Sequence, residues 1–395
     1  MSEEVCDFPA QDFAGGPLPL PRAPVFRTRL PTGEVVWAVT GYDEVRTALA
    51  HPLLARDITA YDPESEAQGA PLAGGALRDR TLLLDGPPHA QLRRLAVRPL
   101  TPRRVAALRP RIEEITGRVV DAFVAAGPPG DLVRGVAFPV PIAVICEILG
   151  IPESDSAVFG RWADRLTTFG AMSQDDSMDA LFALLSYLSE HLAAKRERPG
   201  PDLLSEWLAP GEGEDRFTDA ELTQLALAVL VAGYETTATA IAASVWQLTR
   251  RPDQWRTLSA TPELVPDAVQ ELFRFQPRAP MFRILVARRD LELGGVTIRR
   301  GDGVMPLIWA AHRDPACCAE PDRFDIRRTD NTHIVFGHGP HTCLGMALAT
   351  VELEVVLGAL LCRLPGLRPA APPDTLPWHT DRLTGGGLVT LPVLW

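Results

Sequence analysis

Apolar positions recur along most of the chain with the spacing of helices that bury one face or lie wholly inside a core. The longest such stretch runs from Thr218 to Arg250, and Thr218 with Glu221 forms a capping box at its start. Further helical patterns cover residues 41–50, 103–126, 142–149, 178–198 and 344–363. We therefore expect a mainly α-helical fold.

Short segments with alternating or β-branched residues predict a small β region beside these helices. One segment spans residues 34–40, and another spans 290–305 as two strands joined by a turn at Gly294 and Gly295. The apolar end of the chain, 388–395, predicts a final hairpin. Residues 55–80 have no convincing periodicity, and a long irregular segment in a compact chain usually has a function.

Composition points to a soluble protein that does not bind nucleic acid. The chain has 395 residues and a formal net charge of −11, which disfavours a nucleic-acid surface. It has no run of about 18 apolar residues, and residues 1–13 carry four acids and no apolar targeting segment. Its six cysteines do not form a secreted disulfide framework. We expect a cytoplasmic monomer without membrane insertion.

Positive charge gathers in one stretch, from Arg93 to Arg118. Eight arginines lie there, against Glu113 and Glu114 alone. Such a run of like charges is most often a solvated face. The alternative is a docking patch for an acidic protein partner.

A cysteine follows a short glycine-bracketed loop near the end of the chain, in the segment from Phe336 to Gly345. The helical pattern that follows places Cys343 at or near a helix N-terminus, where backbone N–H groups and the helix dipole stabilise a thiolate. Gly337 and Gly339 permit positive φ and a close backbone approach to a flat cofactor. The pattern indicates a cysteine presented to a metal.

Two other interpretations of this loop are open. Most lone cysteines are simply buried apolar residues. Zinc is a second rival, because His338, His341 and Cys343 could all be ligands, yet the chain has no second ligand pair at zinc-finger or zinc-ribbon spacing.

Polar residues interrupt the apolar helical stretch at its centre, in the segment Leu230 to Thr237. Glu235 and its neighbouring threonines are costly there unless they have partners. Gly233 weakens the helix, and Thr236 can bond the carbonyl of Ala232 four residues back and bend it. The structural alternative is a mere kink.

These features together resemble the cytochrome P450 family. The ten residues from Phe336 to Gly345 match its haem-ligand loop, the segment around Glu235 and Thr236 resembles its oxygen-activation helix, and Glu271 to Arg274 resembles its Glu-x-x-Arg helix. The landmarks occur in the right order over nearly the whole chain. The resemblance implies one P450 domain over residues 1–395, a triangular helical prism with a small β region around haem b.

The resemblance also implies the residues that hold the haem. The Cys343 thiolate is the expected iron ligand, and Phe336, Gly337 and Gly345 belong to its loop. His89, Arg93 and His341 are the expected partners of the haem propionates. Arg283 is a further candidate, although it stands about two residues further from Asp290 than in the common family pattern, so that Leu285 could occupy its usual place.

Further residues are implied in catalysis and in support of the loop. Thr236 is expected to serve oxygen activation, and Glu235 to relay protons. Glu271, Arg274 and Arg323 are expected to form a buried ion network that holds the cysteine loop. Candidate walls of the substrate pocket are Ala232, Gly233, Pro280, Met281, Phe282 and Ile284, with residues 55–80, 161–190 and 382–387 around them.

The implied function is a haem-thiolate monooxygenase that uses dioxygen to hydroxylate or epoxidise a mainly apolar small molecule of secondary metabolism, free or carrier-bound. The sequence has no Walker-type phosphate loop and no Rossmann fingerprint, so we expect no fused reductase domain. Electrons would come from NAD(P)H through a ferredoxin reductase and a ferredoxin. The alternatives are oxidative aromatic coupling or peroxygenation, or a haem sensor or carrier without turnover.

Overall fold

The structure is a computed structural model, and it describes residues 5–8, 21, 23–30, 33–56, 84–167, 174–209, 216–275, 284–379 and 386–395. It is mainly helical with a small β region, as the hydrophobic pattern predicts. The chain forms two compact units. The first unit comprises residues 1–86 and 270–343, and the second comprises residues 87–269 and 344–395.

A six-stranded sheet forms the base of the first unit. Its middle strands are rich in valine and leucine, which suit a buried pleated surface. Strands β3 and β9 pair in parallel, whereas β2 with β3 and β6 with β9 pair antiparallel. The spatial order is β1 (Cys6–Asp7), β2 (Val25–Arg29), β3 (Val35–Val39), β9 (Gly303–Pro306), β6 (Leu285–Ala287) and β4 (Leu54–Ala55).

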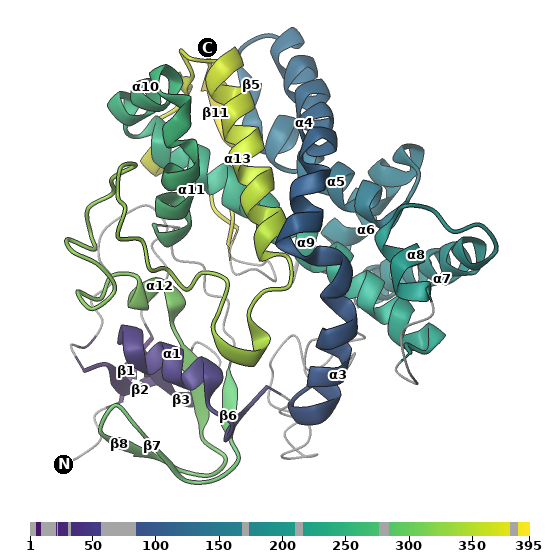
Figure 1. The fold of residues 1–395 in the computed structure, drawn as a ribbon. Helices are drawn as coiled ribbons and strands as arrows, with labels where there is room; N and C mark the ends of the chain where they lie inside the picture. The colour runs from purple at the N-terminus through teal and green to yellow at the C-terminus, as the bar shows by residue number, and fades with distance from the viewer. Residues whose placement is uncertain are drawn as a thin grey trace. The chain divides into compact units, whose positions relative to one another are not determined.

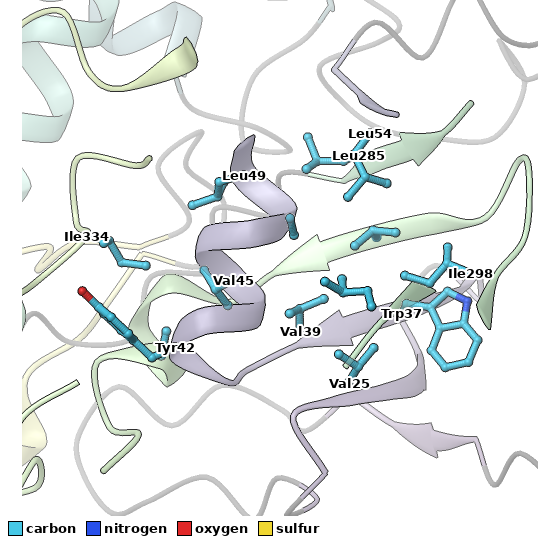
Figure 2. Close-up of a cluster of buried hydrophobic side chains, with 14 of the residues drawn as sticks. Val25, Trp37, Val39, Tyr42, Val45, Leu49, Leu54, Leu285, Ile298 and Ile334 are labelled. Carbon is cyan, nitrogen blue, oxygen red and sulfur yellow. The ribbon is translucent and has the colours of Figure 1, made fainter. Parts of the chain in front are cut away.

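Helix α1 (Tyr42–Ala50) packs its apolar face on this sheet. Figure 2 shows Val45 and Leu49 of the helix gathered with Val39 and Leu285 of the strands in one buried cluster. The first backbone N–H of the helix, on Tyr42, donates to the carboxylate of Asp314 at 2.8 Å. That bond satisfies a donor that a helix N-terminus leaves without an internal partner.

Short elements complete the first unit. Strands β7 (Leu291–Leu293) and β8 (Val296–Ile298) form the predicted hairpin. Both residues of its turn have positive φ, 58° at Gly294 and 79° at Gly295, which explains the glycine pair. The remaining elements are α12 (Ile308–Ala311) and η6 (Gly339–His341), a single 3₁₀ turn.

The second unit is a bundle of helices around α9 (Asp219–Thr249). The predicted capping box is present: Thr218 and Glu221 each accept a hydrogen bond from the other's backbone N–H. Helices packed on or near it are α3 (Gly86–Ala96), α4 (Pro102–Ala125), α5 (Pro139–Leu149), α6 (Ser156–Thr167), α7 (Gln174–Glu197), α8 (Leu203–Leu208), α10 (Pro252–Ala260) and α13 (Met346–Arg363). Helix α11 (Val265–Arg274) contains the division between the two units.

Helices α4 and α13 lie side by side (Figure 1) and are tied by two ion pairs. Arg109 of α4 pairs with Glu354, and Arg363 of α13 bonds Asp121 at 2.5 Å. Short elements around them are η2 (Arg98–Leu100), η3 (Val133–Ala137), η4 (Glu153–Asp155), η5 (Pro262–Leu264), η7 (Pro373–Thr375), and the strands β5 (Gly130–Asp131), β10 (Arg368–Pro369) and β11 (Pro392–Leu394).

One helix, α9, is long and apolar enough by composition to be considered as a membrane span. In the structure, 67% of its most apolar window is buried inside the protein. Its apolar character is therefore that of a core helix. The predicted helices at 103–126 and 344–363 are confirmed as α4 and α13, and the strand at 34–40 as β3.

Candidate functional site

The cysteine loop is held by hydrogen bonds between its own backbone groups. The N–H of Cys343 donates to the carbonyl of Phe336 at 2.8 Å, and the N–H of Gly337 donates to that of Ile334 at 2.8 Å. The Thr342 hydroxyl donates to the Gly339 carbonyl at 2.8 Å. Cys343 itself is exposed, so the loop presents its side chain instead of burying it.

Two glycines give the loop its shape. Gly337 has φ 78° and Gly339 has φ 76°, a region that other residues seldom adopt. At Gly339 space is lacking as well: an added Cβ would lie 2.8 Å from the Cβ of Ala50, at the end of α1. The backbone of the loop therefore approaches α1 closely at Gly339, while its approach to a flat cofactor stays a prediction.

The expected ion pair behind the loop is present. Two N–H groups of Arg274 donate to the Glu271 carboxylate, one from Nε at 2.7 Å and one from a terminal nitrogen at 2.8 Å. Both side chains are wholly buried. The same guanidinium donates to the carbonyls of Pro321 at 2.6 Å, His312 at 3.0 Å and Arg323 at 3.1 Å. Its donors are thus well satisfied, as a buried charge requires.

The third member of this network is Arg328, and the prediction of Arg323 was wrong. The Nε of Arg328 lies 3.2 Å from the Glu271 carboxylate, and the Arg328 side chain is 7% exposed. The side chain of Arg323 is 61% exposed and pairs instead with Glu320 and Asp325. Arg323 contributes only its backbone carbonyl to the network.

The sequence could not distinguish these arginines, because both follow Glu271 at similar separations. A turn containing Glu320, which has a positive φ of 46°, precedes Arg323. Asn331, which the sequence analysis missed, also donates to Glu271 at 3.2 Å.

His312 connects the ion network to the loop. Its backbone carbonyl accepts a hydrogen bond from the Arg274 guanidinium, and its ring Nε2 accepts the N–H of Ile334 at 2.9 Å. Burial holds the pKa of His312 well below its ordinary value, which keeps the ring neutral and able to accept. Since the carbonyl of Ile334 receives the N–H of Gly337, hydrogen bonds run continuously from the ion pair to the cysteine loop.

His341, an expected propionate partner, lies in η6 of the same loop. Its Nε2 is 3.1 Å from the Oδ1 of Asp85, and both side chains are largely buried. Asp85 also accepts the backbone N–H of Arg56 at 2.7 Å and a guanidinium N–H of Arg288 at 3.3 Å. Sequence analysis gave no signal for this carboxylate.

In the second unit, His89 and Arg93 lie one turn apart on α3. His89 is buried and Arg93 half-buried, whereas Ala90, Gln91 and Arg94 are exposed. The two expected propionate partners therefore share the less exposed face of the helix.

Half of the eight arginines in the predicted patch form ion pairs within the protein. Arg104, Arg109, Arg111 and Arg118 pair with glutamates, among them Glu206, Glu354, Glu147 and Glu153. Among the described residues, no ion pair involves Arg93, Arg98 or Arg103. Of these three, Arg98 and Arg103 are exposed and could meet a partner protein.

The centre of α9 has the predicted hydrogen bond from Thr236. The hydroxyl of Thr236 donates to the carbonyl of Ala232. Glu235 is 1% exposed, while Ala232 and Thr236 are exposed in the middle of an otherwise buried helix. At Gly233 an added Cβ would lie 3.1 Å from Ile145, so a larger residue would push on α5. A narrow stripe of small and hydroxyl-bearing residues is therefore left uncovered.

In each unit by itself, the chemistry of these residues suits a haem group. In the first unit, Cys343 is a soft iron ligand and His341 suits a carboxylate. In the second unit, His89 and Arg93 suit carboxylates, and the uncovered stripe on α9 has small side chains. Across the described ranges, no three His, Cys, Asp or Glu residues gather closely enough to hold a metal ion.

Comparison with known proteins decides the family. Residues 254–380 match the family model described as Cytochrome P450. The chain is 40% identical over 391 residues to nocardicin C N-oxygenase of Nocardia uniformis subsp. tsuyamanensis, covering 98% of this chain and 96% of that protein. The chain belongs to the cytochrome P450 family.

Other P450s agree in sequence and in structure. Mycinamicin IV hydroxylase/epoxidase of Micromonospora griseorubida is 40% identical over 377 residues, covering 94% of this chain and 92% of that protein. The solved structure of the mixed-function P450 MycG matches with TM-score 0.89 and 38% identity, covering 99% and 100% of the two chains. The protein is a P450 monooxygenase that uses haem iron and dioxygen, and it requires a redox partner and a small-molecule substrate.

Several predicted residues lie outside the part of the chain that the structure describes: Pro280, Met281, Phe282 and Arg283, along with most of 55–80. Ile284 is described and packs against the buried cluster that contains Val36 and Met305. Leu285, the alternative occupant of the arginine position, is buried in β6.

Proposed function

We propose that residues 1–395 form one P450 domain whose iron ligand is Cys343. The exposed side chain of Cys343 on a backbone-tied loop is the observation that carries this proposal. Cys343→Ser should abolish the red-shifted Soret band of the ferrous–CO complex. Cys362→Ser is the matched control, because Cys362 is the other exposed cysteine among the described residues and lies on α13. An unchanged band in Cys343→Ser would remove the assignment.

We propose that His89, Arg93 and His341, with Arg283, bind the haem carboxylates. When bound, haem supplies the activation of dioxygen, and thiolate donation from Cys343 favours O–O cleavage. The Thr236 hydroxyl already donates to Ala232, so its oxygen is left to accept a hydrogen bond from water. Glu235 would pass protons toward that water. Thr236→Ala should therefore consume reductant with less product and more peroxide, and tight coupling would refute this role.

We propose a mainly apolar substrate of secondary metabolism, hydroxylated or epoxidised, taken free or on a carrier protein. The names of its relatives, an N-oxygenase of nocardicin C and a hydroxylase/epoxidase of mycinamicin IV, support this class. The exposed Ala232 is a small residue on α9, and it leaves space beside the helix for a bulky ligand.

A titration of the ferric Soret band tests the substrate class. Macrolides, steroids, aromatic amino acids, cyclic dipeptides and carrier-bound acyl groups would each be added in turn. A low-to-high-spin shift with one class identifies substrate-like binding. A shift with hydrophilic metabolites alone would contradict an apolar substrate.

We propose a cytoplasmic ferredoxin as the electron donor, reduced from NAD(P)H by a ferredoxin reductase, with Arg98 and Arg103 at its docking surface. Arg103→Gln should raise the KM for ferredoxin at low salt and flatten its dependence on ionic strength. Arg118→Gln is the control, because Arg118 is equally cationic but pairs with Glu153. Equal effects of the two variants would refute the location.

A further inference from the structure

A pocket of about 580 Å³ lies in the second unit, where α8 contacts α7, α9 and η2. That volume is typical of sites for small organic ligands. Further lining comes from the end of α3 and the start of α4. Of the described residues that line it, none is assigned above to haem, to oxygen or to substrate. The pocket therefore has room for a further ligand.

The charge of this pocket is opposite to that of the whole chain. Glu206 is the only acid among its described lining residues, and the chain has a formal net charge of −11. Four arginines line it: Arg98, Arg104, Arg196 and Arg216. Two of them are already neutralised, because Arg104 pairs with Glu206 and Arg196 pairs with Asp219. An excess of positive charge remains, which favours an anionic ligand.

Arg98 and Arg216 supply this excess. Both residues are exposed, and within the described ranges the guanidinium of neither forms an ion pair or a hydrogen bond. A guanidinium presents paired N–H donors that match two oxygens of a phosphate group. A phosphate monoester carries about −1.5 to −2 charges at pH 7, which matches two uncompensated arginines. The charge pattern thus favours a phosphate group over a single carboxylate.

The remaining lining of the pocket is largely apolar and includes two aromatic residues, Trp207 and Phe217. Trp207 is buried, and its indole N–H donates to the carbonyl of Ala96 at 3.3 Å. That bond restrains the ring and satisfies its one polar group. Leu95 and Leu222 contribute further apolar surface. A ligand that fills the pocket therefore needs an apolar body beside its charged group.

We propose that this pocket binds a small organic phosphate monoester with an aromatic body, and that Arg98 and Arg216 bind its phosphate group. Arg98 also belongs to the proposed ferredoxin surface, so a change at Arg98 alone does not separate the two roles. Arg216 lines the pocket and lies outside the arginine-rich stretch, whereas Arg103 lies in that stretch and is not among the described lining residues. Variants of Arg216 and Arg103 therefore distinguish the two proposals.

Isothermal titration calorimetry of the haem-loaded protein with 1-naphthyl phosphate tests the inference. We expect one equivalent to bind with a Kd below about 1 mM. Arg98→Gln and Arg216→Gln should each weaken binding by about tenfold, the usual effect of losing a hydrogen bond to a charged group. 1-Naphthalenesulfonate has the same rings with a single charge and should also bind about tenfold more weakly. Inorganic phosphate lacks the aromatic body and should bind more weakly than 1-naphthyl phosphate.

Arg103→Gln is the matched control, because Arg103 is another exposed arginine of the same unit. It should leave the Kd for 1-naphthyl phosphate unchanged. The ferric Soret band should stay constant during the titration, since the ligand does not enter the haem site. Far-UV circular dichroism should show that every variant is folded.

Several results would overturn the inference, and each has its own meaning. No saturable binding below about 1 mM would show that the pocket does not take this class of ligand. Equal weakening by Arg103→Gln and Arg216→Gln would show general attraction of anions to a basic surface. A Soret shift that follows the titration would place the ligand at the haem. If Arg216→Gln leaves binding unchanged and raises the KM for ferredoxin, the pocket is part of the protein-docking surface instead.

Discussion

The carboxyl group of Glu352 offers a sharp test of the energetics of the second unit. Glu352 lies on the buried face of α13, in line with Leu348 and Val356, and is 3% exposed. Its Oε2 atom has no hydrogen-bond partner among the described residues. Burial therefore raises the pKa of Glu352 well above its ordinary value of 4.5, because an ionised carboxylate would lose its hydration there.

The sign of the effect on stability follows from proton linkage. Above pH 4.5 the unfolded chain loses the Glu352 proton while the folded protein keeps it. The free energy of unfolding then falls with rising pH by about 1.4 kcal/mol per unit from this group, as long as the folded carboxyl stays protonated. In Glu352→Gln the side chain is uncharged in the folded and the unfolded protein, so this pH dependence of the free energy of unfolding is lost.

We expect the stability of Glu352→Gln, measured relative to wild type, to rise by up to about 2.7 kcal/mol between pH 6 and pH 8. Denaturant unfolding followed by tryptophan fluorescence would measure it. Glu354→Gln is the control: Glu354 stands two residues on, paired with Arg109, and its difference from wild type should be constant over the same range. A constant difference for Glu352→Gln too would show that Glu352 is ionised in the folded protein, and would refute the reasoning.

Three further predictions concern the first unit. Arg328→Gln should lower the free energy of unfolding by about 3 kcal/mol, because the buried Glu271 carboxylate loses one of its partners. Arg323→Gln should change it by less than about 0.5 kcal/mol, and equal losses in denaturant unfolding would contradict the assignment of Arg328. Gly339→Ala should cost about 2–4 kcal/mol through its positive φ and its collision with Ala50, and thermal melts should show partial recovery with Ala50→Gly. Burial lowers the pKa of His333 from 6.5 to about 4, so the folded protein binds fewer protons there than the unfolded chain. Stability should therefore fall by about 1.4 kcal/mol per unit as pH drops from 6.5 toward 4, and His333→Gln should remove that share of the slope in denaturant titrations.

The features that the sequence predicted well are local ones. The capping box of Thr218 and Glu221 and the bond from Thr236 to Ala232 join residues three or four positions apart in one helix. Helical geometry alone brings such residues together. The turn at Gly294 and Gly295 belongs to the same class, because both residues have the positive φ of a type I′ hairpin turn, which glycine readily adopts.

The features that the sequence missed join distant segments. Asp85 meets His341 across 256 residues, and no periodicity relates them. Near position 325 the chain offers several arginines, and only the folded chain shows that Arg328 is the one that meets Glu271. The sequence also could not show that glutamates on other helices, Glu354 and Glu147, pair with Arg109 and Arg111 of the arginine patch.

The cysteine loop is held by hydrogen bonds between groups of the protein itself, so we expect it to be ordered without haem. The Arg274 guanidinium donates to the carbonyl of His312, and the His312 ring accepts the N–H of Ile334. The carbonyl of Ile334 in turn accepts the N–H of Gly337, and all of these residues belong to the first unit. Because loss of haem removes none of these bonds, the loop should stay ordered in the apoprotein, and haem binding should carry little ordering cost there. Amide hydrogen exchange of peptides covering 333–343 should therefore show similar protection in both forms. Exchange in the apoprotein at the rate of an unstructured peptide would show that haem, and not the network, orders the loop.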